Sequence, residues 1–155
     1  MSAQVNTSTN FDPRLFLRDE ELDRGVALIL SGERILSAAA ESGRRTAALN
    51  KTELQAILAI RAAPGLSVTD LRDRLGTTTP TMARILGKLD TRGLIRRKKS
   101  GQDGRKRKLE LSLTGKAISD PIAEAMRNSL RAAYRSAGSE NVSGARVVLE
   151  ALADE

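Results

Sequence analysis

The stretch between residues 67 and 93 carries start and stop signals for two short helices, and their spacing constrains the fold more than any other feature. Ser67 and Asp70 have the spacing of a capping box, in which each side chain accepts a hydrogen bond from the other residue's backbone N–H. Gly76 then stands where a glycine commonly ends a helix. These signals predict a helix of about two and a half turns.

A second start signal follows directly. Either Thr78 or Thr79 caps the next helix, and Pro80 occupies its first turn, where a missing backbone N–H does no harm. The inner stripe and the stop of this helix are formed by Met82, Ile85, Leu86, Leu89 and Gly93. Two helices joined by residues 76–78 match the helix-turn-helix, in which the second helix lies in the major groove of DNA.

A basic hairpin is predicted to follow. Residues 94–98 have the pattern of a strand, residues 100–104 form a turn cluster, and Leu109, Leu111 and Leu113 indicate a returning strand with one buried face. Between Arg84 and Lys108 there are eleven lysines and arginines against two aspartates, a net charge of +9 in 25 residues, whereas the whole chain has +7. A helix followed by a basic hairpin, or wing, suits binding to duplex nucleic acid.

Long helices are predicted on both sides of this unit, so the fold is expected to be mainly α. The first ends by Gly43, and its apolar stripe consists of Leu22, Val26, Ile29 or Leu30, and Leu36. Asn50 and Glu53 form a capping-box-like start for a short helix over residues 53–62. A long helix with Pro121 near its start carries the stripe Ile118, Ile122, Met126 and Leu130, and a last helix covers about residues 140–152. These stripes are expected to lie in the core or against a second copy of the chain, which predicts a helical homodimer.

The expected organisation has four parts. Residues 1–17 form a flexible N-terminal arm, and residues 18–48 an N-terminal dimerisation helix. Residues 49–114 form a winged helix-turn-helix DNA-binding domain, and residues 115–155 form C-terminal dimerisation helices. The fold class is therefore a winged helix-turn-helix core with a short basic β-hairpin wing, flanked by long terminal helices.

Several function classes are disfavoured by what the 155 residues lack. Cysteine and histidine are absent, which removes disulfides, thiolates, the commonest metal ligand and the usual neutral-pH base. Without a Gly-rich phosphate loop or paired carboxylates, we expect no enzyme, no metal site and no cofactor.

Aromatic residues are limited to Phe11, Phe16 and Tyr134, so base-stacking recognition of single strands or RNA loops is disfavoured. No targeting or membrane-length segment is evident, which predicts a cytoplasmic protein without membrane contact.

The central part of the chain resembles the MarR family of bacterial transcriptional regulators. The residues that carry the resemblance are Leu75-Gly76, Met82-Ala83-Arg84-Ile85-Leu86, Leu89, Arg92-Gly93-Leu94-Ile95, Arg97, Asp103-Gly104-Arg105, Leu111-Ser112-Leu113-Thr114 and Gly115. The resemblance extends over about residues 22–152. It implies a winged helix-turn-helix dimer that represses by occupying a pseudo-palindromic operator. It also implies that a small ligand, bound between the dimer helices and the DNA-binding lobes, releases this dimer from DNA. Absence of cysteine excludes the thiol-oxidation route of some relatives.

The resemblance also implies that a wing aspartate, here Asp103, positions an arginine that inserts into the minor groove. The segment from Asp103 to Thr114 is a residue or two longer than is habitual in the family, so the wing tip is expected to be extended. Arg105 fits by its distance from Asp103, and Arg107 fits by its distance from Thr114. We assign the role to Arg105 and keep Arg107 as the alternative.

The candidate DNA contacts lie in three groups. The recognition helix offers Thr79, Pro80, Thr81, Arg84 and Lys88. The wing offers Arg97, Lys99, Asp103, Arg105, Lys106, Arg107 and Lys108. Ser67 and Thr69 are minor candidates for phosphate contact.

Each group also has a simpler interpretation. Ser67 and Asp70 are caps first, Lys88 is equally well a solvated side chain, and a charge run is usually a solvated face. In a strand the side chains alternate, so about half of residues 96–99 should point at DNA. An architectural protein that coats DNA with little sequence preference is the alternative function, because the same basic wing would serve it.

Overall fold

The structure is a computed structural model that describes residues 17–99 and 107–153. The chain divides into two compact units, residues 1–35 and residues 36–155. Helix α1 (Asp19–Thr46) begins in the first unit and ends in the second. The expected flexible arm lies almost wholly outside the described residues.

In the first unit, the described residues form the start of α1. Acidic residues occupy its first turn, where they complement the positive end of the helix dipole. The predicted apolar stripe is present but solvent-exposed within this chain, since Leu22, Val26 and Leu30 are 48%, 57% and 64% exposed. This stretch of α1 therefore presents an uncovered apolar surface.

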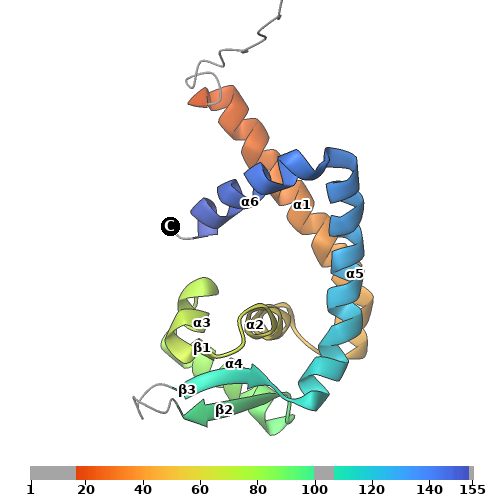
Figure 1. Cartoon of the computed structure of the whole chain (residues 1–155). Coiled ribbons are helices and arrows are strands. Elements are labelled where there is room, and N and C mark those ends of the chain that lie inside the picture. The colour runs from red at the N-terminus through yellow and green to blue at the C-terminus, as the bar shows by residue number, and fades with distance from the viewer. Residues whose placement is uncertain (1–16, 100–106, 154–155) are drawn as a thin grey trace, which may run out of the picture. The chain divides into compact units, whose positions relative to one another are not determined.

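The second unit contains the rest of the fold, and its elements are shown in Figure 1. After the end of α1 come α2 (Lys51–Ala62), β1 (Leu66–Ser67), α3 (Val68–Arg74), α4 (Thr79–Thr91), β2 (Ile95–Lys99), β3 (Arg107–Leu111), α5 (Leu113–Ala137) and α6 (Ser139–Ala153). Helix α2 lies between α3 and α5. The predicted mainly helical fold with a basic hairpin is confirmed.

The three strands form one antiparallel sheet in the order β1-β3-β2. Ile95 pairs with Leu111 and Arg97 with Leu109, so these four residues share one face of the hairpin. Three of the four are apolar and buried, and they cover the core. The two-residue strand β1 had no counterpart in the sequence interpretation, because two residues are too few to show alternation.

A single apolar core holds the second unit together. It joins α2, α3, α4, the sheet and the first half of α5, with Ile57, Leu71, Leu86, Leu109 and Ile122 each at most 1% exposed. Side chains of this size contribute about 1.5–3 kcal/mol each when fully buried. Three of the four residues of the predicted α5 stripe thus belong to the core, because Ile122 is buried and Ile118 and Met126 pack against the core, whereas Leu130 is 39% exposed.

The capping predictions for the short helices are confirmed. Complete capping boxes join Asn50 to Glu53 at the start of α2 and Ser67 to Asp70 at the start of α3. Since Asn50 is itself the N-cap, α2 begins at Lys51, two residues before the predicted start.

The predicted returning strand is wrong at its last residue. Leu113 is the first residue of α5 and is 76% exposed, rather than a buried strand residue. The reason is Ser112, whose hydroxyl accepts a hydrogen bond from the Gly115 amide at 2.9 Å and starts the helix there. The boundary expected at residue 114 between the DNA-binding domain and the dimerisation helices therefore falls inside the first turn of α5.

Candidate nucleic-acid interface

Helices α3 and α4 are joined by a tight turn that the sequence specifies residue by residue. Gly76 has φ +54°, a backbone conformation that side chains disfavour, and it ends the α3 segment. Thr78 caps α4, which decides between the two threonines considered, and Pro80 lies in the first turn. Arg72 of α3 donates a hydrogen bond to the Thr79 hydroxyl at 3.4 Å, which ties the two helices together beyond their core contacts.

Helix α4 buries one face and leaves the other to solvent. Met82, Ile85, Leu86 and Leu89 form the buried face. The exposed face includes Thr79, Pro80, Ala83, Arg84, Gly87, Lys88 and Thr91. Arg84 has no hydrogen-bond or ion-pair partner in the part of the chain that the structure describes. Its five N–H donors are therefore available to a ligand.

Thr81 differs from the other candidates on α4. It is only partly exposed, and its hydroxyl is bonded to that of Thr78 at 3.0 Å in the N-cap. Of the two threonines proposed to face DNA, Thr79 is the more accessible.

Lys88 projects from the exposed side of α4 but has a partner. Its ammonium lies 3.6 Å from Glu53 Oε1, and the Glu53 side chain is almost fully buried. The second carboxylate oxygen of Glu53 accepts the Asn50 backbone N–H at 3.0 Å. Lys88 therefore compensates a buried carboxylate, while its half-exposed side chain still reaches solvent.

Ser67 is primarily a cap, as the simpler interpretation of this residue states. Its hydroxyl donates to Asp70 Oδ2 at 2.7 Å and accepts the Asp70 backbone N–H at 3.1 Å. Thr69 is exposed in the first turn of α3.

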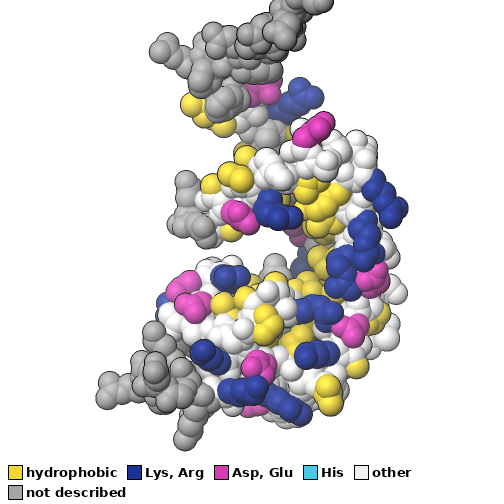
Figure 2. Space-filling model, viewed as in Figure 1, with side chains coloured by type: hydrophobic (Ala, Val, Ile, Leu, Met, Phe, Trp, Pro, Cys, Tyr) yellow, Lys and Arg dark blue, Asp and Glu magenta, His cyan; other side chains and the backbone are white. Residues whose placement is uncertain are grey.

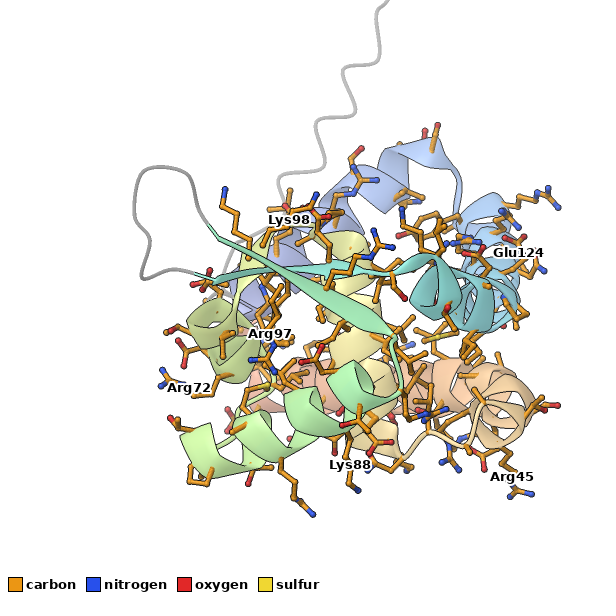
Figure 3. All side chains as sticks on the ribbon, turned by 90° about the horizontal axis from the view of Figure 1, so that it is seen from below. Arg45, Arg72, Lys88, Arg97, Lys98 and Glu124 are labelled. Atoms are coloured by element: carbon orange, nitrogen blue, oxygen red, sulfur yellow. The ribbon has the colours of Figure 1, made fainter. Side chains whose placement is uncertain are left out.

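The hairpin strands carry the basic residues on both faces. Lys and Arg side chains gather over this hairpin in Figure 2. Arg97 lies between β2 and α4, where its guanidinium is 3.6 Å from the carboxylate of Asp90, whereas Lys98 lies on the other side of the sheet and pairs with Glu110 at 2.7 Å (Figure 3). Lys98 pairs in register with Lys108, so these two share that outer face.

The rest of the wing is only partly described. Lys99 and Arg107 are paired in register at the end of the hairpin, but their side chains lie outside the described part of the structure. Asp103, Arg105 and Lys106 also lie outside the described residues. Their roles in the wing therefore remain predictions.

Arg92 makes a long-range contact that the sequence did not predict. Its guanidinium donates to the carbonyl oxygens of Ala47 at 2.6 Å and Ala48 at 3.1 Å, at the connection between α1 and α2. Ala48 has φ +49°, an unfavourable conformation for alanine that these bonds help to hold. The partners are 44 and 45 residues away in sequence, so no local pattern announces the contact.

Two clusters on the helices show strongly perturbed carboxylates. Hydrogen bonds from Arg44 and Arg45 lower the pKa of Glu41 from 4.5 to about 2. Arg131 and Arg127 lower the pKa of Glu124 to about 2 in the same way. Both clusters lie within single helices and stabilise them locally.

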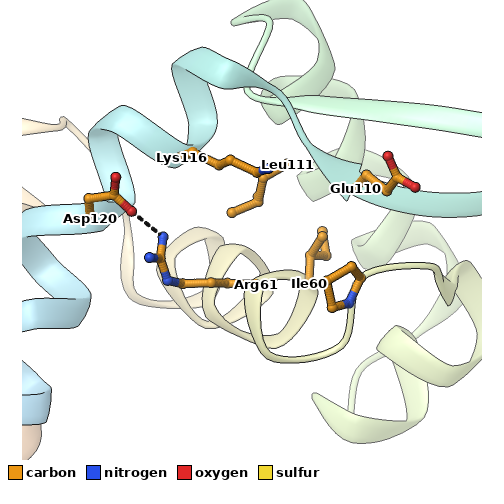
Figure 4. Close-up of a pocket in the computed structure, with 7 residues that line it drawn as sticks. Ile60, Arg61, Glu110, Leu111, Lys116 and Asp120 are labelled. Carbon is orange, nitrogen blue, oxygen red and sulfur yellow. Dashed lines mark ion pairs between the residues drawn. The ribbon is translucent and has the colours of Figure 1, made fainter.

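A depression of about 430 Å³ lies at the end of α2, against β3 and the start of α5 (Figure 4). Its apolar lining consists of Ile60, Pro64 and Leu111. Arg61 crosses its edge, paired with Asp120 at 2.6 Å and bonded to the buried Ser119 hydroxyl at 3.0 Å. Lys116 also borders it and has no ion-pair partner within residues 17–99 and 107–153.

The described residues hold no cluster of three or more His, Cys, Asp or Glu side chains able to bind a metal ion. Within the same residues, no helix is both long and apolar enough to span a bilayer.

Comparison with known proteins identifies the family. The profile of the MarR family matches residues 49–106. The HTH-type transcriptional regulator PetP of Rhodobacter capsulatus is 36% identical over 140 residues, which cover 90% of this chain and 84% of PetP. The chain belongs to the MarR family. It is accordingly an HTH-type transcriptional regulator, a member of a family of DNA-binding regulators rather than of enzymes.

Solved structures show the same MarR-type winged helix fold. NadR in complex with 4-hydroxyphenylacetate superposes with a TM-score of 0.72 at 21% identity, over 99% of this chain and 97% of NadR. A MarR family regulator from Silicibacter pomeroyi gives 0.66 at 21% identity, over 81% and 84%. A mutant MepR from S. aureus bound to an oligodeoxyribonucleotide gives 0.55 at 17% identity, over 82% and 94%.

Proposed function

We propose that this MarR-family regulator is a homodimeric repressor that occupies a pseudo-palindromic operator. The observation that carries the proposal is the exposed face of α4, where Arg84 is unengaged by the described residues beside a cationic hairpin. A purely electrostatic coating protein would not require such a helix, so the face favours sequence-specific binding over the architectural alternative. The mutant MepR seen with an oligodeoxyribonucleotide shares the fold, which supports DNA as the partner.

The direct contacts follow from side-chain chemistry. With α4 in the major groove, Arg84 would bond a guanine bidentately, and Thr79 would meet a phosphate or a thymine methyl group. Arg105, or Arg107 in its place, would enter the minor groove from the wing and respond to groove width. Lys98 and Lys108, on the outer face of the hairpin, would neutralise phosphates if that face meets DNA.

Uncovered apolar helices support the homodimer. Helix α6 has no buried residue, and its Val147, Val148, Leu149 and Leu152 are 50–65% exposed. The start of α1 exposes a further apolar stripe. Exposed apolar surface of this kind commonly marks an interface, and a second copy of the chain is the simplest partner. In the dimer, two α4 helices about 34 Å apart would engage successive half-sites.

Two measurements test the proposal. Sedimentation equilibrium should give a dimer at the concentrations used for DNA binding. Mobility shifts at physiological salt should then show tighter binding to the gene's own upstream region than to random duplex of equal length, with a footprint of two half-sites. A monomer, or equal affinity for both duplexes, would contradict the repressor.

We further propose that a small anionic molecule bound in the depression beside Arg61 releases the repressor. The two carboxylates of the lining, Asp120 and Glu110, are paired with Arg61 and Lys98. Lys116 therefore supplies an available cation beside the apolar residues, which suits a ligand with a carboxylate and a hydrophobic body. NadR, which shares the fold, was solved with 4-hydroxyphenylacetate, so this compound is a reasonable first probe.

The effector proposal has its own test. Titration of 4-hydroxyphenylacetate and related aromatic carboxylates into the purified protein should raise the melting temperature and weaken operator binding. Lys116→Met should abolish both effects while leaving ligand-free DNA binding intact. An unchanged response in Lys116→Met would place the ligand elsewhere.

A further inference from the structure

A glycine stands in the second half of α4, on the face that the proposed function directs at DNA. Gly87 is the ninth of the 13 residues of this helix and is exposed. Glycine inside a helix destabilises it relative to alanine, because glycine loses more conformational freedom on folding. A glycine at this position therefore calls for a physical reason.

Nothing within the described chain supplies that reason. A Cβ atom added at Gly87 would meet no atom within 4 Å, and its φ is not positive. Two glycines of the same unit, Gly43 and Gly115, have clear internal roles. A Cβ at Gly43 would lie 2.6 Å from Ile122, and a Cβ at Gly115 would collide with the Leu94 carbonyl. Gly87 faces open space on the outside of the molecule.

Gly87 also lines a groove with mainly basic borders. The groove, about 700 Å³, runs between α4 and the connection from α1 to α2. Three cationic residues border it, Arg84, Lys88 and Arg92, against a single carboxylate, Glu53. That carboxylate is buried, and it is already paired with Lys88 and hydrogen-bonded to the Asn50 backbone N–H. The net charge along the groove favours an anionic occupant.

We propose that this groove receives one sugar–phosphate strand of the duplex, and that Gly87 is where the strand lies against the α4 backbone. The inference rests on the proposed function, and it adds a strand-binding surface beside the base-reading face of α4. Without a side chain at residue 87 the strand can approach the helix closely, between the cations at residues 84 and 88. A larger side chain there would weaken the close contact between the strand and the helix backbone, while both long cationic side chains could still reach their partners on the DNA.

The test compares Gly87→Ala and Gly87→Leu with the wild-type dimer on two duplexes, the operator and a random sequence. Because the site contacts backbone rather than bases, both duplexes should lose affinity by the same factor. Gly87→Leu should raise Kd by about tenfold or more and Gly87→Ala by less. Neither variant should change the slope of log K against log salt, since no cation is removed.

Two controls separate this effect from others. Lys88→Ala should reduce the salt slope by about one if Lys88 contacts a phosphate. Gly144→Ala changes another exposed helical glycine with nothing within 4 Å, in α6, and should leave Kd unchanged once sedimentation shows an intact dimer. Because alanine favours helix, Gly87→Ala should melt about 1–3 °C above the wild type, so its lost affinity cannot reflect unfolding.

The outcomes are distinct. Unchanged Kd for both Gly87 variants would overturn the inference, and so would a loss confined to the operator, since that pattern belongs to base contact. If the wild-type protein does not prefer its operator over random duplex, the proposed repressor fails instead, whatever the variants do.

Discussion

Replacing Ser112 by alanine should destabilise the second unit by about 2 kcal/mol, because one hydroxyl makes two hydrogen bonds at the junction of the hairpin and α5. Its oxygen accepts the Gly115 amide at 2.9 Å, and its hydrogen goes to the Gly93 carbonyl at 2.6 Å. The Ser112 side chain is itself buried, with the residue 7% exposed. Water therefore cannot easily replace both partners.

The magnitude is the sum of two losses. Removal of an N-cap serine or threonine costs about 1 kcal/mol, within a range of roughly 0.5–2. The second bond has a net value of about 1 kcal/mol, since Gly93 lies at the surface and its carbonyl can turn to water. Together these give about 2 kcal/mol, and up to roughly 3 if the carbonyl stays dry.

Urea unfolding followed by circular dichroism, at one fixed protein concentration, measures the effect. Thr78→Ala is the matched control, because Thr78 is exposed and water can replace its hydroxyl in both of its bonds, to the Thr81 amide at 3.4 Å and to the Thr81 hydroxyl at 3.0 Å. It should cost under about 1 kcal/mol. If Ser112→Ala costs no more than Thr78→Ala, the two-bond account of this junction is refuted.

Three further predictions concern DNA binding, packing and pH. Arg84→Ala should weaken operator binding selectively by about 1–3 kcal/mol, whereas Arg105→Ala should weaken binding more evenly across sequences, as mobility shifts on both duplexes would show. Gly115→Ala should cost more than about 3 kcal/mol or prevent folding, because its Cβ would overlap the Leu94 carbonyl; near-wild-type melting would contradict this. Since the pKa of Glu124 falls from 4.5 to about 2 on folding, its stabilising effect should be complete above pH 4.5 and lost as pH falls toward 2. Unfolding curves of wild type and Glu124→Gln should therefore converge through that window, and a pH-independent difference would argue against the pairing.

The elements that the sequence predicted well are those with local signals. Capping boxes join residues three apart, so Asn50 with Glu53 and Ser67 with Asp70 are visible in the letters alone. The turn between α3 and α4 is equally local, because Gly76 supplies a positive φ and Pro80 fits a first helical turn. These few residues were enough to indicate the helix-turn-helix.

The error at Leu113 has a different physical origin. Leu109, Leu111 and Leu113 alternate as a strand would, yet the alternation stops where Ser112 caps α5. A serine three residues before Gly115 is itself a helix-start signal, and it was overridden by the more regular apolar pattern. The N-cap at Ser112, rather than the alternation of leucines, therefore sets the boundary between β3 and α5.

The engaged cations could not be predicted from sequence. Within one basic block, Arg92 binds backbone carbonyls, Arg97 lies beside Asp90, and Lys88 compensates Glu53. Two of these partners are 35 or more residues distant, so only the fold brings them together. Net charge alone therefore overstates how many of these side chains are available to DNA. Arg84 remains the candidate on α4 without a partner in the described chain.

Arg92 has a mechanical consequence. Its guanidinium belongs to the C-cap residue of α4, but its two bonds are made to the connection that follows α1. A displacement of residues 47 and 48 must therefore either move the C-terminal end of α4 with it or first break both of these hydrogen bonds.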